Sequence, residues 1–367
     1  MPVTPCPELA VVVPTFKERG NVAELVRRLD TALDGIAFEV IFVDDDSPDG
    51  TAEAVRELSR RDGRVRALQR LGRRGLASAC IEGALATSAE YVAVMDADLQ
   101  HDEQILPVML KALKEGKADV VIGSRYAEGG GVGDWDPTRA RMSRLATGIS
   151  HLIVPASVSD PMSGYFMVPR ELFSGAARQM SSMGFKLLAD LLATAGKQTR
   201  VLEVPYRFRN RHSGESKLDS LVAWEFLLLV ADKLIGRWVP VRFISFAAVG
   251  GSGVVVHVAV LALLHRFGDI EFKSAQAAAT LTAMIGNFAL NNVLTYRDAR
   301  LRGIAWLRGL IVFILACSVG AVANVGVAGF LYGRETDWLL AALAGIAVGT
   351  VWNFTVSSFY AWRIGRR

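Results

Sequence analysis

The chain has 367 residues, 51% of them hydrophobic, and a formal net charge of only +4. Its mean hydropathy of +0.29 is high for a soluble protein, and the apolar excess lies after about residue 217. The modest charge gives no reason to expect a nucleic-acid partner, and three widely separated cysteines favour neither a zinc site nor a disulfide framework. We therefore expect an α/β domain followed by an apolar domain.

Hydrophobic runs alternate with amphipathic segments through the first half of the chain. Runs typical of buried strands occupy residues 9–14, 38–43, 65–69, 91–95, 119–124, 166–168 and 201–208. Helical periodicity follows each of the first three runs and returns further along the chain. This alternation predicts a mostly parallel, doubly wound sheet.

Acidic residues follow three of these runs where each one ends. They are Glu18, the run 44–46, and the pair Asp96 and Asp98. In an open parallel sheet these strand ends share the edge at which ligands bind, and a cation or the donors of a nucleotide would relieve the repulsion between the acids. The run 44–46 precedes Ser-Pro-Asp-Gly, which is typical of turns, so capping and ligand binding both stay open for it.

The sequence 96–100 is Asp-Ala-Asp-Leu-Gln. Side chains two residues apart in an extended segment point the same way, so Asp96 and Asp98 can share a divalent cation, with Gln100 as a neutral oxygen ligand. Ligation by oxygen alone suits Mg²⁺ or Mn²⁺, the ions that hold diphosphates. The alternative is that the acidic triplet only begins the next helix.

Arginines gather at 125–144 and 207–217. They form either a solvated charged face or an anion site beside the metal. A lone lysine, Lys186, lies in an apolar helical segment, where such a residue usually reaches the surface.

The pattern changes after residue 217. Residues 218–240 are apolar but interrupted by charges, which suits a helix along a membrane interface. Segments that approach membrane-spanning length lie at about 243–264, 275–295, 307–332 and 338–362. Arginines concentrate in the connections on one side, so the positive-inside rule places both ends and the α/β domain in the cytoplasm.

A nucleotide-type domain attached to a membrane suggests transfer from a soluble donor to a lipid acceptor. A cation held by Asp96 and Asp98 would neutralise a leaving diphosphate. A lipid phosphate is already anionic and needs no strong general base, so arginines are better suited to hold it. Arg125, Arg139 and Arg211 would supply them.

Six ordered motifs resemble the dolichyl-phosphate mannose synthase group of the GT-A, family 2 glycosyltransferases. They occupy residues 13–18, 43–51, 95–101, 123–126, 160–165 and 214–217. Asn287-Phe288 and Trp352-Asn353-Phe354 resemble a GtrA-like membrane domain. The resemblance implies a Rossmann-like GT-A domain at 1–217, an interfacial segment at 218–240, and a membrane domain with four transmembrane helices at 241–367.

The resemblance also implies a function and a set of site residues. The function is metal-dependent, inverting transfer of mannose from GDP-mannose to dolichyl or polyprenyl phosphate at the cytoplasmic membrane face, with Mg²⁺ or Mn²⁺ as cofactor. Implied nucleotide contacts are Pro14, Phe16, Glu18, Val43, Asp45, Asp96, Ala97 and Asp98. Implied metal ligands are Asp96, Asp98 and Gln100. Implied acceptor-phosphate contacts are Arg125, Arg139, Ser143, Lys186, Arg211 and Lys217. Implied catalytic residues are Asp96, Asp98, Arg125 and Arg211.

Two departures from the family pattern are visible. Phe16 replaces the usual tyrosine, and residues 73–78 replace the usual Gly-Leu-Gly turn. A sister group that uses UDP-glucose or UDP-N-acetylglucosamine type donors shares nearly every motif and is the first alternative. A non-enzymatic membrane scaffold is a more distant one, which the intact acids disfavour. A processive polysaccharide synthase would carry Gln-x-x-Arg-Trp, and residues 218–239 lack it.

Overall fold

The protein is described by a computed structural model. It describes residues 6–133, 137–180, 186–196, 198–209, 220–236, 238–335 and 337–362. The chain divides into two compact units, Met1–Leu234 and Ile235–Arg367, which are taken separately below.

A seven-stranded sheet forms the centre of the first unit, in the order β3-β2-β1-β4-β6-β5-β7. The strands are β1 (Leu9–Thr15), β2 (Phe38–Asp44), β3 (Val65–Gln69), β4 (Tyr91–Val94), β5 (Val120–Ser124), β6 (Phe166–Pro169) and β7 (Val201–Pro205). Within the described chain, β6 alone runs antiparallel to its neighbours. The mostly parallel sheet expected from the sequence is confirmed.

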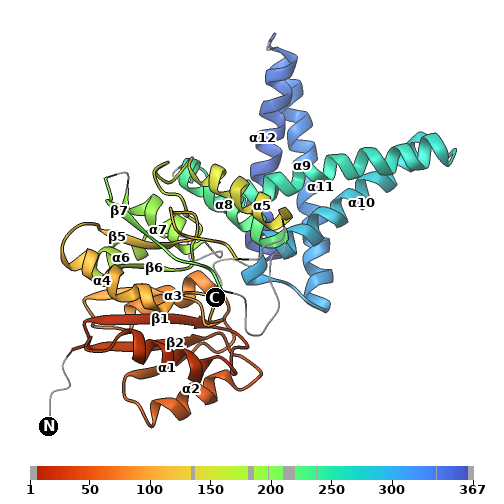
Figure 1. Cartoon of the computed structure of the whole chain (residues 1–367). Helices are drawn as coiled ribbons and strands as arrows, with labels where there is room; N and C mark the ends of the chain where they lie inside the picture. The colour runs from red at the N-terminus through yellow and green to blue at the C-terminus, as the bar shows by residue number, and fades with distance from the viewer. Residues whose placement is uncertain are drawn as a thin grey trace. The chain divides into compact units, whose positions relative to one another are not determined.

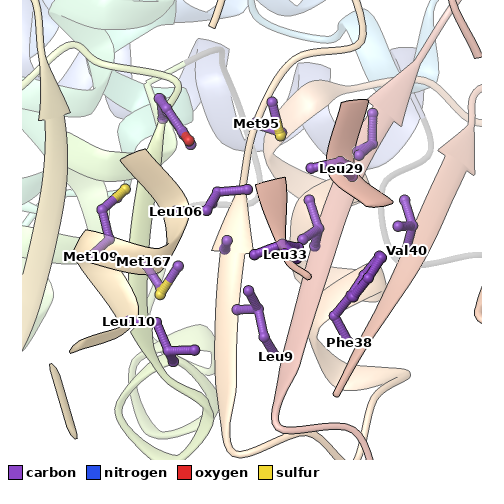
Figure 2. Close-up of a cluster of buried hydrophobic side chains, with 14 of the residues drawn as sticks. Leu9, Leu29, Leu33, Phe38, Val40, Met95, Leu106, Met109, Leu110 and Met167 are labelled. Carbon is purple, nitrogen blue, oxygen red and sulfur yellow. The ribbon is translucent and has the colours of Figure 1, made fainter. Parts of the chain in front are cut away.

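Helices cover both faces of this sheet (Figure 1). They are α1 (Val22–Ala32), α2 (Thr51–Ser59), α3 (Leu76–Leu85), η1 (Glu103–Ile105), α4 (Leu106–Lys114), α5 (Pro137–Ser150), α6 (Arg170–Ala177), α7 (Leu187–Ala195) and α8 (Ser220–Ile235). Successive strand residues point to opposite faces. Val11 therefore packs with α1 and α4, and Val12 packs with α3, α6 and α7. Figure 2 shows the first of these layers, with Leu9, Leu29 and Leu33 in it.

The second unit is helical. Its elements are α9 (Val241–Leu261) with the π-helix η2 (Ala262–Phe267), α10 (Phe272–Leu294), η3 (Arg297–Ala299), α11 (Ile304–Tyr332), and α12 (Trp338–Val356) with the π-helix η4 (Ser357–Ala361). In the described residues, three helices are long and apolar enough to cross a membrane: Val241–Phe267, Ile304–Tyr332 and Trp338–Ala361. The segment expected at 275–295 is α10, which has 23 residues but does not reach the same apolar character.

Polar residues of α10 explain its lower hydropathy. Asn292 is buried and accepts a hydrogen bond from Nε1 of Trp362 at 3.1 Å. The ring of Trp362 stacks on Tyr296 at 4.0 Å between centroids. Asn287 lies against Gly253 of α9, where a Cβ atom would collide with its amide. Small residues that let helices approach closely, and polar groups paired inside the bundle, are typical of membrane helices.

Gly83 of α3 sets how closely this helix approaches the sheet. A Cβ atom at this position would lie 2.5 Å from Cγ1 of Val12 and 2.9 Å from Cγ2 of Val43. We expect Gly83→Ala to destabilise the first unit, because overpacking costs about 1–3 kcal/mol, whereas alanine in a helix gains only roughly 0.5–1 kcal/mol over glycine. Calorimetry of the full chain in detergent measures the change. Gly175→Ala on α6 is the control, since a Cβ atom there meets open space; equal melting temperatures of the two variants would contradict the expectation.

Candidate active site

The acidic loops meet at one edge of the sheet. Strands β2, β1 and β4 are parallel neighbours, with Thr15 opposite Asp44 and Val12 opposite Val94. The loops that begin at Phe16, Asp45 and Met95 therefore leave the sheet side by side. This is the edge at which open α/β sheets bind ligands.

The two interpretations of the run 44–46 apply to different residues. Asp44 closes a turn: its Oδ2 accepts a hydrogen bond from the Ser47 backbone N–H at 2.9 Å, and its Oδ1 accepts one from Thr15 Oγ1 at 3.2 Å. Asp45 faces the loop after β3 instead. Arg70 donates to Oδ1 of Asp45 at 2.7 Å, and the Gly75 N–H donates to Oδ2 at 2.7 Å. Asp44 therefore stabilises its own turn, and Asp45 is held by the loop after β3; the expected contact of Asp45 with a nucleotide stays a prediction.

Arg70 is a site residue that the sequence analysis missed. Its side chain is only 3% exposed, and it also donates to Ser78 Oγ at 2.6 Å. Burial raises the pKa of Asp45, and the hydrogen bonds from Gly75 and Arg70 act against that rise. The signal in the sequence was a cation, Arg70, placed directly after β3, whereas the loops after β1, β2 and β4 carry acids.

The β1 loop lies against the same segment. The guanidinium of Arg74 stands 4.3 Å from the centroid of the half-buried Phe16 ring, a cation–π contact. Lys17 has a φ of 64° and donates its N–H to Ser47 Oγ at 3.0 Å, which ties the first loop to the second. Glu18 accepts a hydrogen bond from Nδ2 of Asn21 at 2.7 Å. The two departures from the family pattern, Phe16 and the segment 73–78, therefore contact each other.

The loop after β4 turns sharply after its second aspartate. Leu99 has a φ of 62°, and the Gln100 N–H donates to Oδ1 of Asp98 at 3.2 Å. Asp98 is 5% exposed, whereas the side chain of Asp96 is 38% exposed. Ala97, between them, is buried.

These residues fit a divalent cation of the Mg²⁺ type. Asp96, Asp98 and Gln100 offer only oxygen ligands. Within the described ranges no group of three or more His, Cys, Asp or Glu residues could hold a metal ion. Asp96 and Asp98 could hold Mg²⁺ together with substrate phosphates, because enzymes that act on nucleotides commonly bind this ion through one or two carboxylates and the phosphates.

His101 supports the segment 96–100, which contains the predicted metal ligands and is called the metal loop below. The sequence analysis did not identify this histidine as a site residue. It is 3% exposed and stacks on Tyr165 with 4.9 Å between ring centroids. Burial lowers its pKa to about 4, so the ring is neutral at pH 7. Nδ1 accepts the Asp96 N–H at 3.1 Å, which orients the backbone of the first aspartate.

Arg209 joins the metal loop to the segment after β7. Nε2 of Gln100 donates to the Arg209 carbonyl oxygen at 2.9 Å, and the Arg209 N–H donates back to the Gln100 carbonyl at 3.0 Å. Its guanidinium pairs with Asp102 and Glu103, each at 2.7 Å. Arg211 and Lys217, which were predicted to contact the acceptor phosphate, lie outside the described residues.

Arg125 is fixed by a buried carboxylate. Its Nε and Nη2 donate to the two oxygens of Asp160 at 2.8 Å each, and Asp160 is fully buried. Glu203 of β7 accepts the Asp160 N–H at 3.0 Å and so holds this turn. Two of the sequence motifs, 123–126 and 160–165, thus meet through one ion pair.

The remaining predicted phosphate contacts lie on two helices. Ser143 of α5 accepts a hydrogen bond from Tyr126 Oη at 2.8 Å, which connects it to the residue after Arg125. Arg139 lies on the same helix, and its side chain is not described. Lys186 is the residue before the first turn of α7. The carboxylates Asp96 and Asp98 and the buried Arg125–Asp160 ion pair therefore occur in the first unit.

Comparison with known proteins gives two family matches. Residues 10–175 match the model of glycosyl transferase family 2, and residues 245–362 match GtrA/DPMS, transmembrane domain. A dolichol-phosphate mannosyltransferase of Pyrococcus furiosus is 35% identical over 357 residues, 97% of this chain and 99% of that protein. Dolichol-phosphate mannosyltransferases of Mycosarcoma maydis and Saccharomyces cerevisiae are 36% and 34% identical; each match covers 65% of this chain, and 83% and 91% of the respective relatives.

We expect Asp98→Asn to weaken Mn²⁺ binding by about tenfold or more, because it removes one of two anionic ligands; even the loss of an outer-shell partner typically costs 10–100-fold. Titration of the full chain with Mn²⁺, followed by electron paramagnetic resonance, measures the affinity. Asp34→Asn is the matched control, since this aspartate is exposed and lies before β2, not after a strand of the site edge. An unchanged affinity in Asp98→Asn would place the cation elsewhere.

Proposed function

Because the chain belongs to the family of dolichol-phosphate mannosyltransferases, we propose that it transfers mannose from GDP-mannose to dolichyl or polyprenyl phosphate with Mg²⁺ or Mn²⁺ as cofactor. The chain is a glycosyltransferase and a membrane protein. The observation that carries the proposal is the metal loop, 96–100, beside Asp45 at the carboxyl edge of the sheet.

We assign the nucleotide-sugar donor to the carboxyl edge of the sheet. We assign nucleotide contacts to Pro14, Phe16, Glu18, Val43, Asp45, Asp96, Ala97 and Asp98. Asp96, Asp98 and the amide oxygen of Gln100 would hold the cation, which when bound neutralises charge on the leaving diphosphate. The hydrogen bond from Gln100 Nε2 to Arg209 supports this role, because it fixes the amide plane and leaves the oxygen as the ligand atom.

The acceptor phosphate needs residues that bind it and does not need a general base. A phosphate oxygen of the lipid attacks the anomeric carbon as the bond to the donor diphosphate breaks, with inversion, and that oxygen is already anionic at neutral pH. His101 is not needed as a base and is occupied by the Asp96 N–H. We assign the acceptor phosphate to Arg125, Arg139, Ser143, Lys186, Arg211 and Lys217. Asp160 holds Arg125 in place through a buried ion pair at 2.8 Å.

Reaction at the cytoplasmic face would bring the two substrates together. We propose a catalytic domain at 1–217, an interfacial segment at 218–240 and a membrane domain at 241–367. Helix α8 fits the interfacial role, because Phe226 and Val230 are buried in the first unit while Leu227 and Leu234 stay exposed. Orientation with the catalytic domain in the cytoplasm rests on the distribution of arginines in the connections.

A donor panel tests the reaction. We expect the full chain in detergent, with Mg²⁺ or Mn²⁺ and polyprenyl phosphate, to move label from radiolabelled GDP-mannose into the organic phase, and not from UDP-glucose or UDP-N-acetylglucosamine. Transfer of label from a UDP sugar would agree with the proposed acceptor and would show that the donor is not GDP-mannose. Folded protein that moves label from none of the three would overturn the proposal.

Arg125→Lys tests the acceptor site. Lysine keeps the charge but loses the bidentate geometry toward Asp160. Because a hydrogen bond to a charged group is worth about 1.5–3 kcal/mol, we expect the KM for polyprenyl phosphate to rise roughly tenfold or more, while the KM for GDP-mannose stays unchanged. Arg200→Lys is the matched control, since Arg200 makes a similar pair with Asp119 near the start of β5, away from the site. A parallel rise in both KM values of Arg125→Lys would contradict this division of roles.

A further inference from the structure

Helix α8 packs on the catalytic unit just before the first membrane helix, α9, begins at Val241. Phe226 and Val230, one turn apart, form a buried cluster with Met162, and Ala146 and Ile149 of α5 pack against it. Leu229 joins the larger hydrophobic layer that contains α7. The helix is therefore part of the catalytic unit and not only a tether.

A buried ion pair adds a directional contact to this packing. Nζ of Lys233 lies 2.6 Å from Oδ1 of Asp190, and their side chains are 13% and 3% exposed. The same ammonium donates to Thr194 Oγ1 at 2.8 Å and to the Gln179 carbonyl at 3.3 Å. Three acceptors match its three N–H donors. Because charges lose hydration when buried, such a pair adds little net stability but strongly disfavours other registers of α8 on α7.

Three of the elements that α8 contacts carry or support a group assigned to the acceptor phosphate. Lys186 is the residue before α7, and its carbonyl oxygen accepts a hydrogen bond from the Asp190 N–H at 3.2 Å, so the backbones of the two residues are in contact. Met162 lies in the turn whose Asp160 holds Arg125. Helix α5 carries Arg139 and Ser143.

We propose that Lys233 is a positioning residue for the lipid-phosphate acceptor: through its pair with Asp190, α8 holds α7, α5 and the turn at 160–163 in the register in which their phosphate-binding groups converge. This inference rests on the proposed function. It assigns Lys233 no contact with substrate. It also means that α8, the helix that precedes the first membrane helix, contacts the elements proposed to bind the membrane-bound substrate.

Kinetics of the full chain in phospholipid vesicles test the proposal. We expect Lys233→Met to raise the KM for polyprenyl phosphate about tenfold, with the KM for GDP-mannose changed by less than about twofold, because the partners of Lys233 are Asp190, Thr194 and Gln179 and none of them is a donor residue. Asp190→Asn is expected to act likewise, and the double variant to show much less than the product of the two effects, since both remove one interaction. Lys111→Met is the control, because this lysine is exposed on α4.

A merely structural role for Lys233 would raise both KM values together or lower the amount of active enzyme without changing either, and both outcomes would overturn the proposal. If Lys233→Met does not fold, Met162→Ala replaces it, and the same selective rise in the acceptor KM is expected because the contact of α8 with the turn is lost. Unchanged acceptor KM in Met162→Ala overturns the inference. Wild-type protein that transfers no sugar to polyprenyl phosphate overturns the proposed function itself.

Discussion

Repulsion among carboxylates at one edge of the sheet is the constraint around which the first unit is built. Parallel strands deliver Asp44, Asp45, Asp96 and Asp98 to the same edge, where like charges destabilise one another unless each finds compensation. Each acid is compensated differently. Asp44 accepts hydrogen bonds within its own turn, and Asp45 faces Arg70. Asp98 accepts the Gln100 N–H, and Asp96 and Asp98 are the residues we propose for a cation that the substrate diphosphate would help to hold.

On the proposed acceptor side, the charge that needs a partner is a cation, and a buried carboxylate supplies it. Arg125 would bind an anion best if it did not move, and Asp160 holds it with two hydrogen bonds while Glu203 holds the turn. A buried ion pair of this kind fixes the positions of its side chains but adds little to the free energy of unfolding. Lys233 and Asp190 repeat the arrangement between α8 and α7. Buried ion pairs thus occur both at Arg125, which we propose to bind the acceptor phosphate, and between the helices α7 and α8.

Local patterns were enough to predict the sheet, since strands buried on both faces read as continuous hydrophobic runs and their ends carried the acids. The partners of those acids were not predictable in the same way. Arg70 and Arg209 contact residues on other loops, and His101 contacts the backbone of Asp96 within its own loop; the local sequence does not name any of these partners. Helix α10 shows a similar limit: its asparagines lower its hydropathy, and only the packing reveals that Asn292 is paired with Trp362.

The stacking of Trp362 on Tyr296 has a consequence for biogenesis. One aromatic cluster joins Phe246 of α9, Phe288 of α10, Phe313 of α11 and Trp362. A chain leaving the ribosome would insert its first three helices before the residue that completes this cluster has been synthesised. The membrane unit therefore completes this aromatic core only after Trp362 has been synthesised, and until then lipid or the insertion machinery has to cover the aromatic surface of the earlier helices.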